Sequence, residues 1–252
     1  MERARRIKHN RRSPRAQGTM TIEYNGLAPP TRRETLQELR LPLDALRWAP
    51  QWFGLPRGRA VTPRAVVLLP GFGAGPRSLV ALRRHLRRRG HTAVDWGLGR
   101  NTGRVPQLRD ALRERVAALV HDTGGPVTLV GWSLGGYIAR ELAREHPELV
   151  RRIVTLGSPV VGGPRFTATA HWYVAQGFDL DQIERAVKDR YARPLNTPVV
   201  AIYSKRDGVV AWQACIDRWS PDVRNVEVDE SHFGMGFAPD VLRIVAEEVE
   251  RD

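Results

Sequence analysis

Residues 127–135 read VTLVGWSLG, and this stretch decides the fold. The apolar run at 127–130 has the length and composition of a buried strand, and the turn GWSLG follows it at 131–135. An amphipathic pattern with apolar residues at every fourth position comes next, until Pro147 ends it. Strand, glycine turn and helix in this order predict a strained turn with Ser133 at its tip, because glycines on both sides let the strand and the helix approach closely.

The same alternation of strand and helix repeats along most of the chain. Further strands are predicted at 65–69, 91–94, 152–156, 199–203 and 223–228. Helical spacing predicts helices around 79–86, 108–119 and 241–249, and another that starts at Trp212. Repeated units of this length imply an α/β fold, a mostly parallel sheet with helices on both faces. We expect one such core domain over residues 61–252.

The regular alternation stops at Gly162, and the next predicted strand starts only at Val199. The interval at 162–196 is longer than a plain connection between a helix and a strand. It has helical stretches near 168–176 and 179–190, and its aromatic residues include Phe166, Trp172, Tyr173 and Phe178. We therefore expect a small helical cap, or lid, inserted in the core domain.

Residues 20–60 precede the first predicted strand and are expected to be helical. Four leucines repeat on one helical face, at Leu36, Leu39, Leu43 and Leu46. Pro42 suits the first turn of a second helix. This pattern favours a layer packed on the core, and the alternative is an anchor at a membrane interface.

The chain carries a formal net charge of +13, and the distribution of this charge decides its meaning. Residues 1–19 hold seven Lys or Arg and one Glu, a net charge of +6, so we expect a disordered basic tail, with Met20 as an alternative start. The remaining charge is spread over helix faces and forms no stripe of basic and aromatic residues. We expect no obligatory nucleic-acid partner, and only weak contact between the tail and a membrane or another anionic surface.

Composition excludes several other classes of protein. Cys215 is the single cysteine, so no internal disulfide can form. No secretory signal and no apolar run long enough to span a bilayer are visible, which predicts a cytoplasmic location. The glycine-rich loops at 71–75 and 97–103 lack the spacing of nucleotide-binding motifs, and no histidine, cysteine and carboxylate cluster has metal-ligand spacing. We therefore expect neither a cofactor nor a metal.

A serine needs a base to become a nucleophile, and the base needs an acid to orient it. Asp207 follows the strand predicted at 199–203, and His232 follows the strand predicted at 223–228. Because the carboxyl ends of parallel strands share one edge of a sheet, both side chains can meet Ser133 there. Other histidines compete poorly, since His85, His121 and His146 fall on predicted helices and His9 in the tail, whereas His171 lies in the insertion. Among the rival acids, Asp217 and Asp222 lie on or after a helix, and Asp229 and Glu230 are too close to His232 in sequence.

From about residue 64 to 250 the chain resembles the α/β-hydrolases, and in particular bacterial lipases and esterases of that fold. The motifs that carry this resemblance are LPGFG at 69–73, GWSLGG at 131–136, SKRD at 204–207 and SHFG at 231–234. The resemblance implies that Ser133 is the nucleophile, His232 the general base and then acid, and Asp207 the residue that orients the imidazole.

The resemblance also implies an oxyanion hole built from the backbone N–H groups of Phe72 and Leu134. Many relatives have a histidine where this chain has Pro70, so we expect the hydrogen bonding behind that turn to differ. Trp132, Trp172 and Phe233 are candidate substrate contacts. Residues 1–60 lie outside the shared pattern, and the first two antiparallel strands of many relatives are not evident.

The sequence thus predicts a serine carboxylic ester hydrolase, a lipase or carboxylesterase, that acts on a small-molecule or lipid ester through an acyl-enzyme. A thioesterase or an acyltransferase would use the same groups. A further alternative is a binding protein on a hydrolase scaffold, with the basic tail recruiting nucleic acid or an anionic membrane. Pocket shape decides acyl-chain preference, and neither that preference nor the oligomeric state follows from the sequence.

Overall fold

The computed structural model describes residues 27–56, 58, 60, 62–191, 193 and 195–251. The basic tail at 1–19, and the disorder expected for it, lie outside these residues.

One six-stranded sheet forms the centre of the molecule, and every neighbouring pair of strands is parallel. Its strands are β1 (Ala65–Leu69), β2 (Thr92–Asp95), β3 (Val127–Trp132), β4 (Val150–Leu156), β5 (Val199–Ser204) and β6 (Val223–Val228). They lie in the order β2-β1-β3-β4-β5-β6. The central strand β3 is buried along its whole length, which explains its unbroken apolar run. The predicted α/β fold is therefore confirmed, and the sheet is fully parallel.

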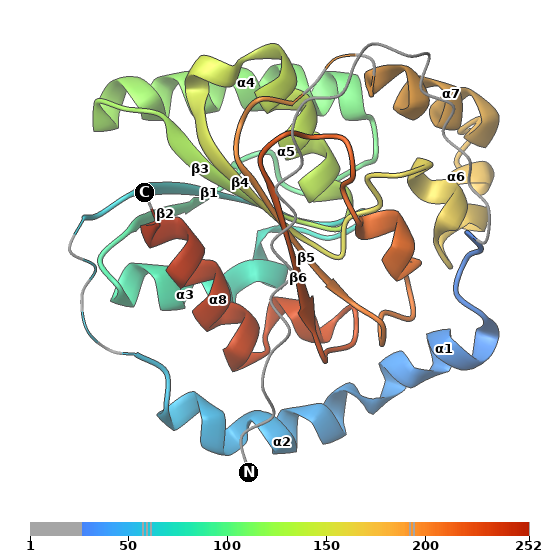
Figure 1. Cartoon of the computed structure of the whole chain (residues 1–252), viewed down its shortest axis with the longest axis horizontal. Helices are drawn as coiled ribbons and strands as arrows, with labels where there is room; N and C mark the ends of the chain where they lie inside the picture. The colour runs from blue at the N-terminus through green and yellow to red at the C-terminus, as the bar shows by residue number, and fades with distance from the viewer. Residues whose placement is uncertain are drawn as a thin grey trace.

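Helices cover both faces of the sheet (Figure 1). The long helices of the core are α3 (Val80–Arg88), α4 (Val105–Thr123), α5 (Leu134–Glu145) and α8 (Pro239–Glu250). The apolar faces of α3 and α8 share one buried cluster, which contains Leu82 and Val241, whereas α4 and α5 share the cluster on the other face. The order of strands and helices thus brings the carboxyl ends of β3, β5 and β6 to one edge.

Short 3-10 turns link several of these elements. They are η1 (Glu38–Arg40), η2 (Pro76–Leu79), η3 (Pro147–Leu149), η4 (Gly163–Phe166), η5 (Trp212–Cys215) and η6 (Gly234–Gly236). The helix predicted from Trp212 is only the turn η5. It stops because Ile216 is extended, and the carboxylate of Asp217 then accepts the N–H groups of Trp219 and Ser220.

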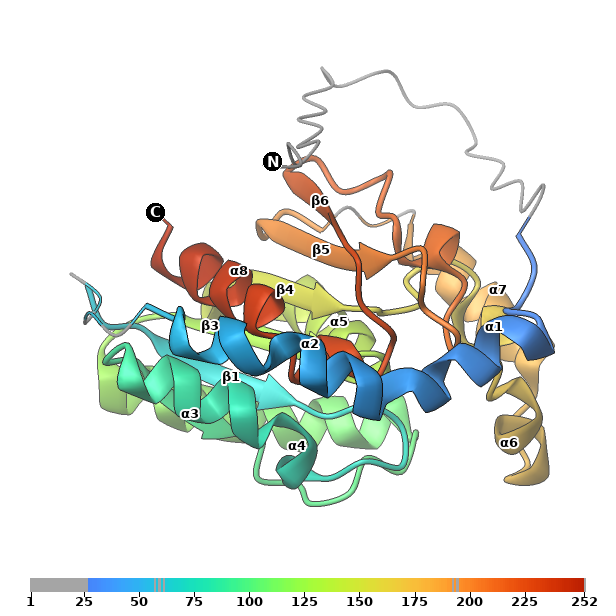
Figure 2. The ribbon, with the colours of Figure 1, turned by 90° about the horizontal axis from the view of Figure 1, so that it is seen from below.

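The insertion between β4 and β5 contains two helices, α6 (Ala170–Ala175) and α7 (Leu180–Arg190). Asp179 caps α7 by accepting the backbone N–H groups of Asp181 and Gln182. Figures 1 and 2 both place α6 and α7 together at one end of the molecule, to the side of the sheet.

The N-terminal arm, residues 31–53, comprises α1 (Arg32–Gln37), η1 and α2 (Leu41–Phe53). It runs as one rod beyond the layer of α3 and α8, in front of that layer when the molecule is seen from below (Figure 2). Thr31 caps α1 in a capping box with Glu34, and Pro42 lies at the start of α2, as predicted.

The face of the arm that meets the rest of the protein is not the leucine face. Leu39 and Leu46 are 74% and 73% exposed, and Leu36 and Leu43 are also mostly exposed. Trp48 is buried in the cluster of α3 and α8 instead, and the carboxylates of Glu38 and Asp44 point inward with it. The leucine spacing thus marked a helix correctly but not its buried side.

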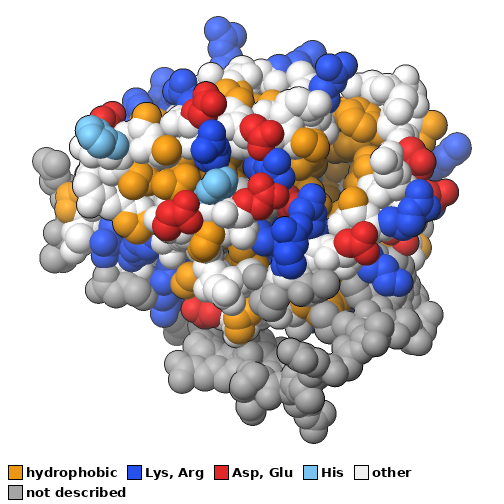
Figure 3. Space-filling model, turned by 90° about the horizontal axis from the view of Figure 1, so that it is seen from above, with side chains coloured by type: hydrophobic (Ala, Val, Ile, Leu, Met, Phe, Trp, Pro, Cys, Tyr) orange, Lys and Arg blue, Asp and Glu red, His pale blue; other side chains and the backbone are white. Residues whose placement is uncertain are grey.

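Charges of both signs are mixed on the surface. On the face shown in Figure 3, Lys and Arg side chains lie among Asp and Glu side chains, around a hollow lined by apolar groups. Among the helices that the structure describes, none is long and apolar enough to cross a membrane.

Candidate active site

Ser133 lies in a strained turn between β3 and α5. Its backbone has φ 53° and ψ −123°, and within the described residues it is the only residue other than glycine with a positive φ. A Cβ on Gly131 would lie 2.3 Å from the backbone nitrogen of Gly136, and one on Gly135 would lie 2.3 Å from the carbonyl oxygen of Leu69. The glycines of the motif are therefore required because strand β1, strand β3 and helix α5 meet there without room for side chains.

His232 and Asp207 lie in the two loops that follow β6 and β5. We call residues 205–210 the acid loop and residues 229–234 the base loop. His232 Nδ1 lies 2.7 Å from Asp207 Oδ2, and both side chains are buried. The other carboxylate oxygen of Asp207 accepts two backbone N–H groups of its own loop, which fixes the orientation of the carboxylate.

The surroundings of His232 favour its charged form. Burial of the ring acts to lower the pKa of His232, but the charge and hydrogen bond of Asp207, together with the charge of Glu38, raise the pKa above its usual value. An imidazole held in this way is suited to accept a proton and to be stabilised as the imidazolium.

The turn that carries Ser133 adjoins this pair. The backbone N–H of Ser133 donates to the carbonyl of Leu156 at the end of β4. A Cβ on the next residue, Gly157, would lie within 3 Å of both Asp207 Oδ2 and His232 Nδ1. The ring of Trp132 lies 5.6 Å from the His232 ring, centroid to centroid. The structure thus gathers Ser133, His232 and Asp207 at one edge, although within the described residues no hydrogen bond joins the hydroxyl of Ser133 to the imidazole.

The turn after β1 closes one side of the site. A Cβ on Gly71 would lie 3.2 Å from Ser133 Cβ, so the N–H of Phe72 comes from a segment in contact with the nucleophile turn. Leu134 is the first residue of α5, where the N–H has no partner within the helix. The buried Asn101 donates to the carbonyl of Pro70 at 2.8 Å, and this bond supports the turn after β1.

A cavity of about 450 Å³ is lined by Leu134, the neighbour of Ser133 in sequence, and by residues of α4, α5, α6 and α7. Its walls are mainly apolar, and Tyr173 and Phe178 contribute the aromatic side chains from the insertion. Phe72 stacks on Tyr173 with ring centroids 4.2 Å apart, which links the turn after β1 to this wall.

The three aromatic residues predicted to contact substrate lie elsewhere. Trp132 is buried, with its ring against those of His232 and Phe233, and Phe233 is partly exposed. Trp172 is exposed on α6. None of the three lines the cavity, which is lined by the neighbouring Tyr173 instead. The sequence showed an aromatic cluster in the insertion, but the spacing in so short a helix did not decide which ring faces inward.

Sequence reasoning missed Glu38 altogether. This buried residue of the arm accepts hydrogen bonds from the acid loop and from the base loop. A single glutamate in a helical stretch carries no local signal for such a contact, because its partners lie 170 to 195 positions away.

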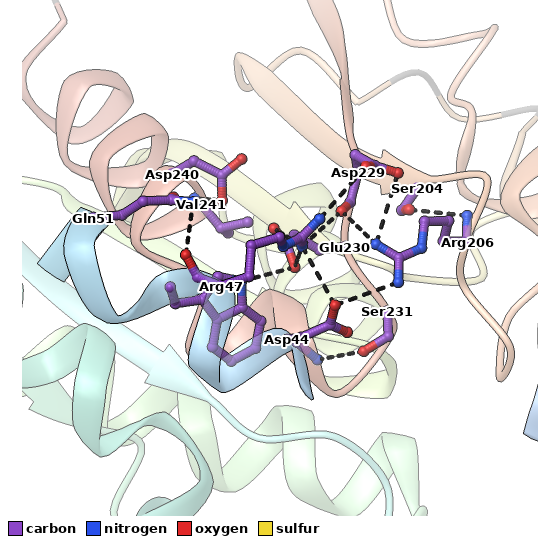
Figure 4. Close-up of polar contacts among 12 residues, drawn as sticks. Asp44, Arg47, Gln51, Ser204, Arg206, Asp229, Glu230, Ser231, Asp240 and Val241 are labelled. Carbon is purple, nitrogen blue, oxygen red and sulfur yellow. Dashed lines mark hydrogen bonds and ion pairs between the residues drawn. The ribbon is translucent and has the colours of Figure 1, made fainter. Parts of the chain in front are cut away.

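Other polar side chains extend the contact between the arm and the two loops (Figure 4). Arg47 Nη2 lies 2.8 Å from the buried carboxylate of Glu230, and Trp48 Nε1 donates to the same group at 3.1 Å. Arg206, in the acid loop, lies 3.4 Å from the carboxylate of Asp44. Burial and the charge of Asp240 raise the pKa of Glu230 to about 7, against the opposing effect of Arg47.

The described residues include no group of three or more histidine, cysteine or acidic side chains that could hold a metal ion.

Several curated proteins are similar to part of this chain. A pimeloyl-[acyl-carrier protein] methyl ester esterase of Aromatoleum aromaticum is 37% identical over 110 residues, which is 42% of each chain. The enzyme of the same name from Edwardsiella ictaluri is 30% identical over 139 residues, 52% of this chain and 48% of its own. The chain thus spans about half the length of these relatives, or less.

Solved structures share the fold at low sequence identity. A lipase-esterase related protein from Clostridium acetobutylicum superposes with a TM-score of 0.56 at 15% identity, covering 77% of this chain and 96% of its own. A monoacylglycerol lipase from Paleococcus ferrophilus gives a TM-score of 0.55 at 14% identity and covers 78% and 98%. The model of the alpha/beta hydrolase family matches residues 66–246, more than two thirds of the sequence, and the chain therefore belongs to the α/β-hydrolase family.

Proposed function

We propose that this protein is a serine carboxylic ester hydrolase in which Ser133, His232 and Asp207 form the catalytic triad. The observation that carries the proposal is the bonded pair of His232 and Asp207 beside a serine in a positive-φ turn. Such a turn stores backbone strain, and strain of this kind is kept where it exposes a reacting group. The names of the curated relatives, which are ester hydrolases, support the same reaction class.

In the proposed reaction His232 takes the proton of the Ser133 hydroxyl while the oxygen attacks the ester carbonyl. The negative charge that develops on the carbonyl oxygen is bound by the N–H groups of Leu134 and Phe72. His232 then gives its proton to the leaving alcohol, which leaves an acyl-enzyme. Water, deprotonated by His232, releases the acid and restores Ser133.

We take the cavity beside Leu134 to hold the acyl chain, with α6 and α7 as its cap. Its mainly apolar walls suit an extended acyl group, and Tyr173 and Phe178 form part of the wall that the insertion contributes. Arg104, Arg109 and Arg190 also line the cavity, together with Glu141. Arg109 and Arg190 are ion-paired with Glu145, and Arg190 also with Glu141, so Arg104 is the lining arginine that best suits an acyl group ending in a carboxylate or a carrier with negative charge.

Replacing the nucleophile tests this function. Ser133→Ala is expected to lower kcat for p-nitrophenyl butyrate by about 1000-fold or more, because no group replaces the attacking oxygen. Circular dichroism and thermal unfolding should show the fold unchanged.

Ser158→Ala is a matched control. Ser158 is a buried serine whose hydroxyl lies near Gly136 of the same turn, and among the described residues this hydroxyl has no hydrogen-bond partner. This variant should keep near wild-type activity. Full activity in folded Ser133→Ala would exclude the proposed nucleophile.

A further inference from the structure

Glu38 places one buried carboxylate between the two loops that carry the proposed acid and base. Its Oε1 accepts the backbone N–H of Gly208 and that of His232, both at 2.8 Å. Its Oε2 accepts the N–H of Phe233 at 3.0 Å. The residue is only 6% exposed, so these charge-assisted hydrogen bonds are made away from water, where they are strong.

The sheet itself does not hold these two loops together. The ladder between β5 and β6 ends where Ser204 pairs with Val228, so Asp207 lies three and His232 four residues beyond the last paired positions. The distance between the carboxylate of Asp207 and the imidazole must therefore be set by contacts outside the sheet. Glu38 bonds to Gly208, the residue after Asp207, and to His232 itself. Contacts at these two positions set the separation of the Asp207 carboxylate and the imidazole most directly.

The arm is pressed against the acid loop around this carboxylate. A Cβ on Gly208 would lie 2.3 Å from the carbonyl oxygen of Glu34, so only glycine fits between the arm and Asp207. Thr35 Oγ1 donates to the carbonyl of Gly208 at 2.9 Å. Gly208 is thus held by the arm through its N–H, through its carbonyl and through close backbone contact.

A carboxylate is a costly residue for a purely structural contact. Burying a negative charge carries a large desolvation cost. Among the described residues, the three hydrogen-bond donors to the Glu38 carboxylate are backbone N–H groups, and no basic side chain forms an ion pair with it. The charge does, however, lie near the imidazole that becomes positive during the proposed reaction. It acts in the same direction as Asp207 on the pKa of His232.

We propose that Glu38 is a positioning residue, whose carboxylate holds the acid and base loops at the separation that the hydrogen bond between Asp207 and His232 requires. The proposal rests on the proposed function. Glu38 lies outside residues 66–246, which match the family model, so this chain supplies the contact from a segment beyond the shared hydrolase pattern.

Glu38→Gln tests the proposal because it keeps the shape and removes the charge. An amide has one acceptor oxygen and one donor group, so at least one backbone N–H must lose its acceptor. The expected result is a fall in kcat of about tenfold to hundredfold with little change in KM, since the substrate site is untouched. The acidic limb of the kcat/KM profile should move to lower pH, because loss of the negative charge lowers the pKa of His232.

Glu34→Gln is the matched control on the same arm. Glu34 is exposed, and within the part of the chain that the structure describes its carboxylate bonds only to Thr31. A capping box accepts glutamine as well as glutamate. The control removes the same charge one turn away, and it should leave kcat and the pH profile unchanged.

Glu38→Asp separates the charge from the reach of the side chain. It keeps the carboxylate but is too short for all three N–H groups, so kcat should fall while the acidic limb stays near its wild-type position. A folded Glu38→Gln protein with wild-type kcat and a wild-type pH profile would overturn the proposal. The proposal would also fail if Glu38→Gln lowered only the stability of the protein and Glu38→Asp kept full kcat. If either of these results were found and Ser133→Ala were inactive, the role of Glu38 would be refuted and the proposed function would stand. An active Ser133→Ala protein would refute the proposed function itself.

Discussion

The nucleophile turn and the acid and base loops are held in different ways. Six consecutive residues, 131–136, build the nucleophile turn, and they are fixed by close backbone contact with β1 and α5. The acid and base loops extend beyond the sheet and are tied to an arm that precedes them by more than 160 residues. The first arrangement follows from a short local sequence, whereas the second exists only once distant segments have met.

Two glycines allow this difference to be measured, because both would place a Cβ 2.3 Å from a carbonyl oxygen. Gly135→Ala should have the largest effect. Its Cβ would strike Leu69 in the buried strand β1, and neither the strand nor α5 can move without disrupting the core. We expect a loss of about 3 kcal/mol in the free energy of unfolding, measured by urea denaturation, together with loss of esterase activity. Wild-type stability would show that the turn is less tightly packed than its geometry indicates.

Gly208→Ala should have a smaller effect on stability. Its Cβ would strike Glu34, but the arm lies at the surface and can shift away from the acid loop. We expect a loss of about 1 kcal/mol in the free energy of unfolding. The variant should lose more kcat than this small loss of stability alone would cause, because a shift of the arm also moves Glu38 away from the acid and base loops. Equal effects of Gly208→Ala and Gly135→Ala on stability would contradict the distinction between the two regions.

Leu39→Ser should have the smallest effect, although Leu39 is the neighbour of Glu38. Its side chain is 74% exposed, so the free energy of unfolding should change by no more than about 0.5 kcal/mol, and kcat should not change. Thermal unfolding measures the change in stability, and the p-nitrophenyl butyrate assay measures kcat. A large loss of stability would mean that the leucine face of the arm is covered in solution.

Much of the core was predictable because its signals are local. Apolar runs located β1, β3, β4 and β5, since a strand covered on both faces must be apolar throughout. The edge strands β2 and β6 are only partly buried and carry no such run, and the alternation of strand and helix indicated them instead. The turn at 131–135 followed from two glycines beside a serine. Asp207 and His232 could be named as candidates because each comes just after a strand, and parallel strands present such positions at one edge.

Other parts of the site could not be predicted. The leucine spacing in the arm predicted a helix, but it did not show that the leucines are exposed. The structure shows that Trp48 and the carboxylates of Glu38 and Asp44 face inward instead. In the insertion, adjacent aromatic residues on α6 have opposite environments, with Tyr173 buried in the cavity wall and Trp172 exposed. Periodicity alone cannot settle which side of a short helix is covered, because that depends on what packs against it.

The sequence by itself determined the parallel α/β sheet and the strained turn at Ser133, because strand burial, glycine spacing and helix periodicity act between residues that are close along the chain. Only the tertiary structure decided that Asp207 Oδ2 and His232 Nδ1 are held 2.7 Å apart and that Glu38 bonds to both of their loops. These contacts join residues far apart in sequence, and a buried carboxylate finds its backbone partners only after the sheet, the loops and the arm have assembled.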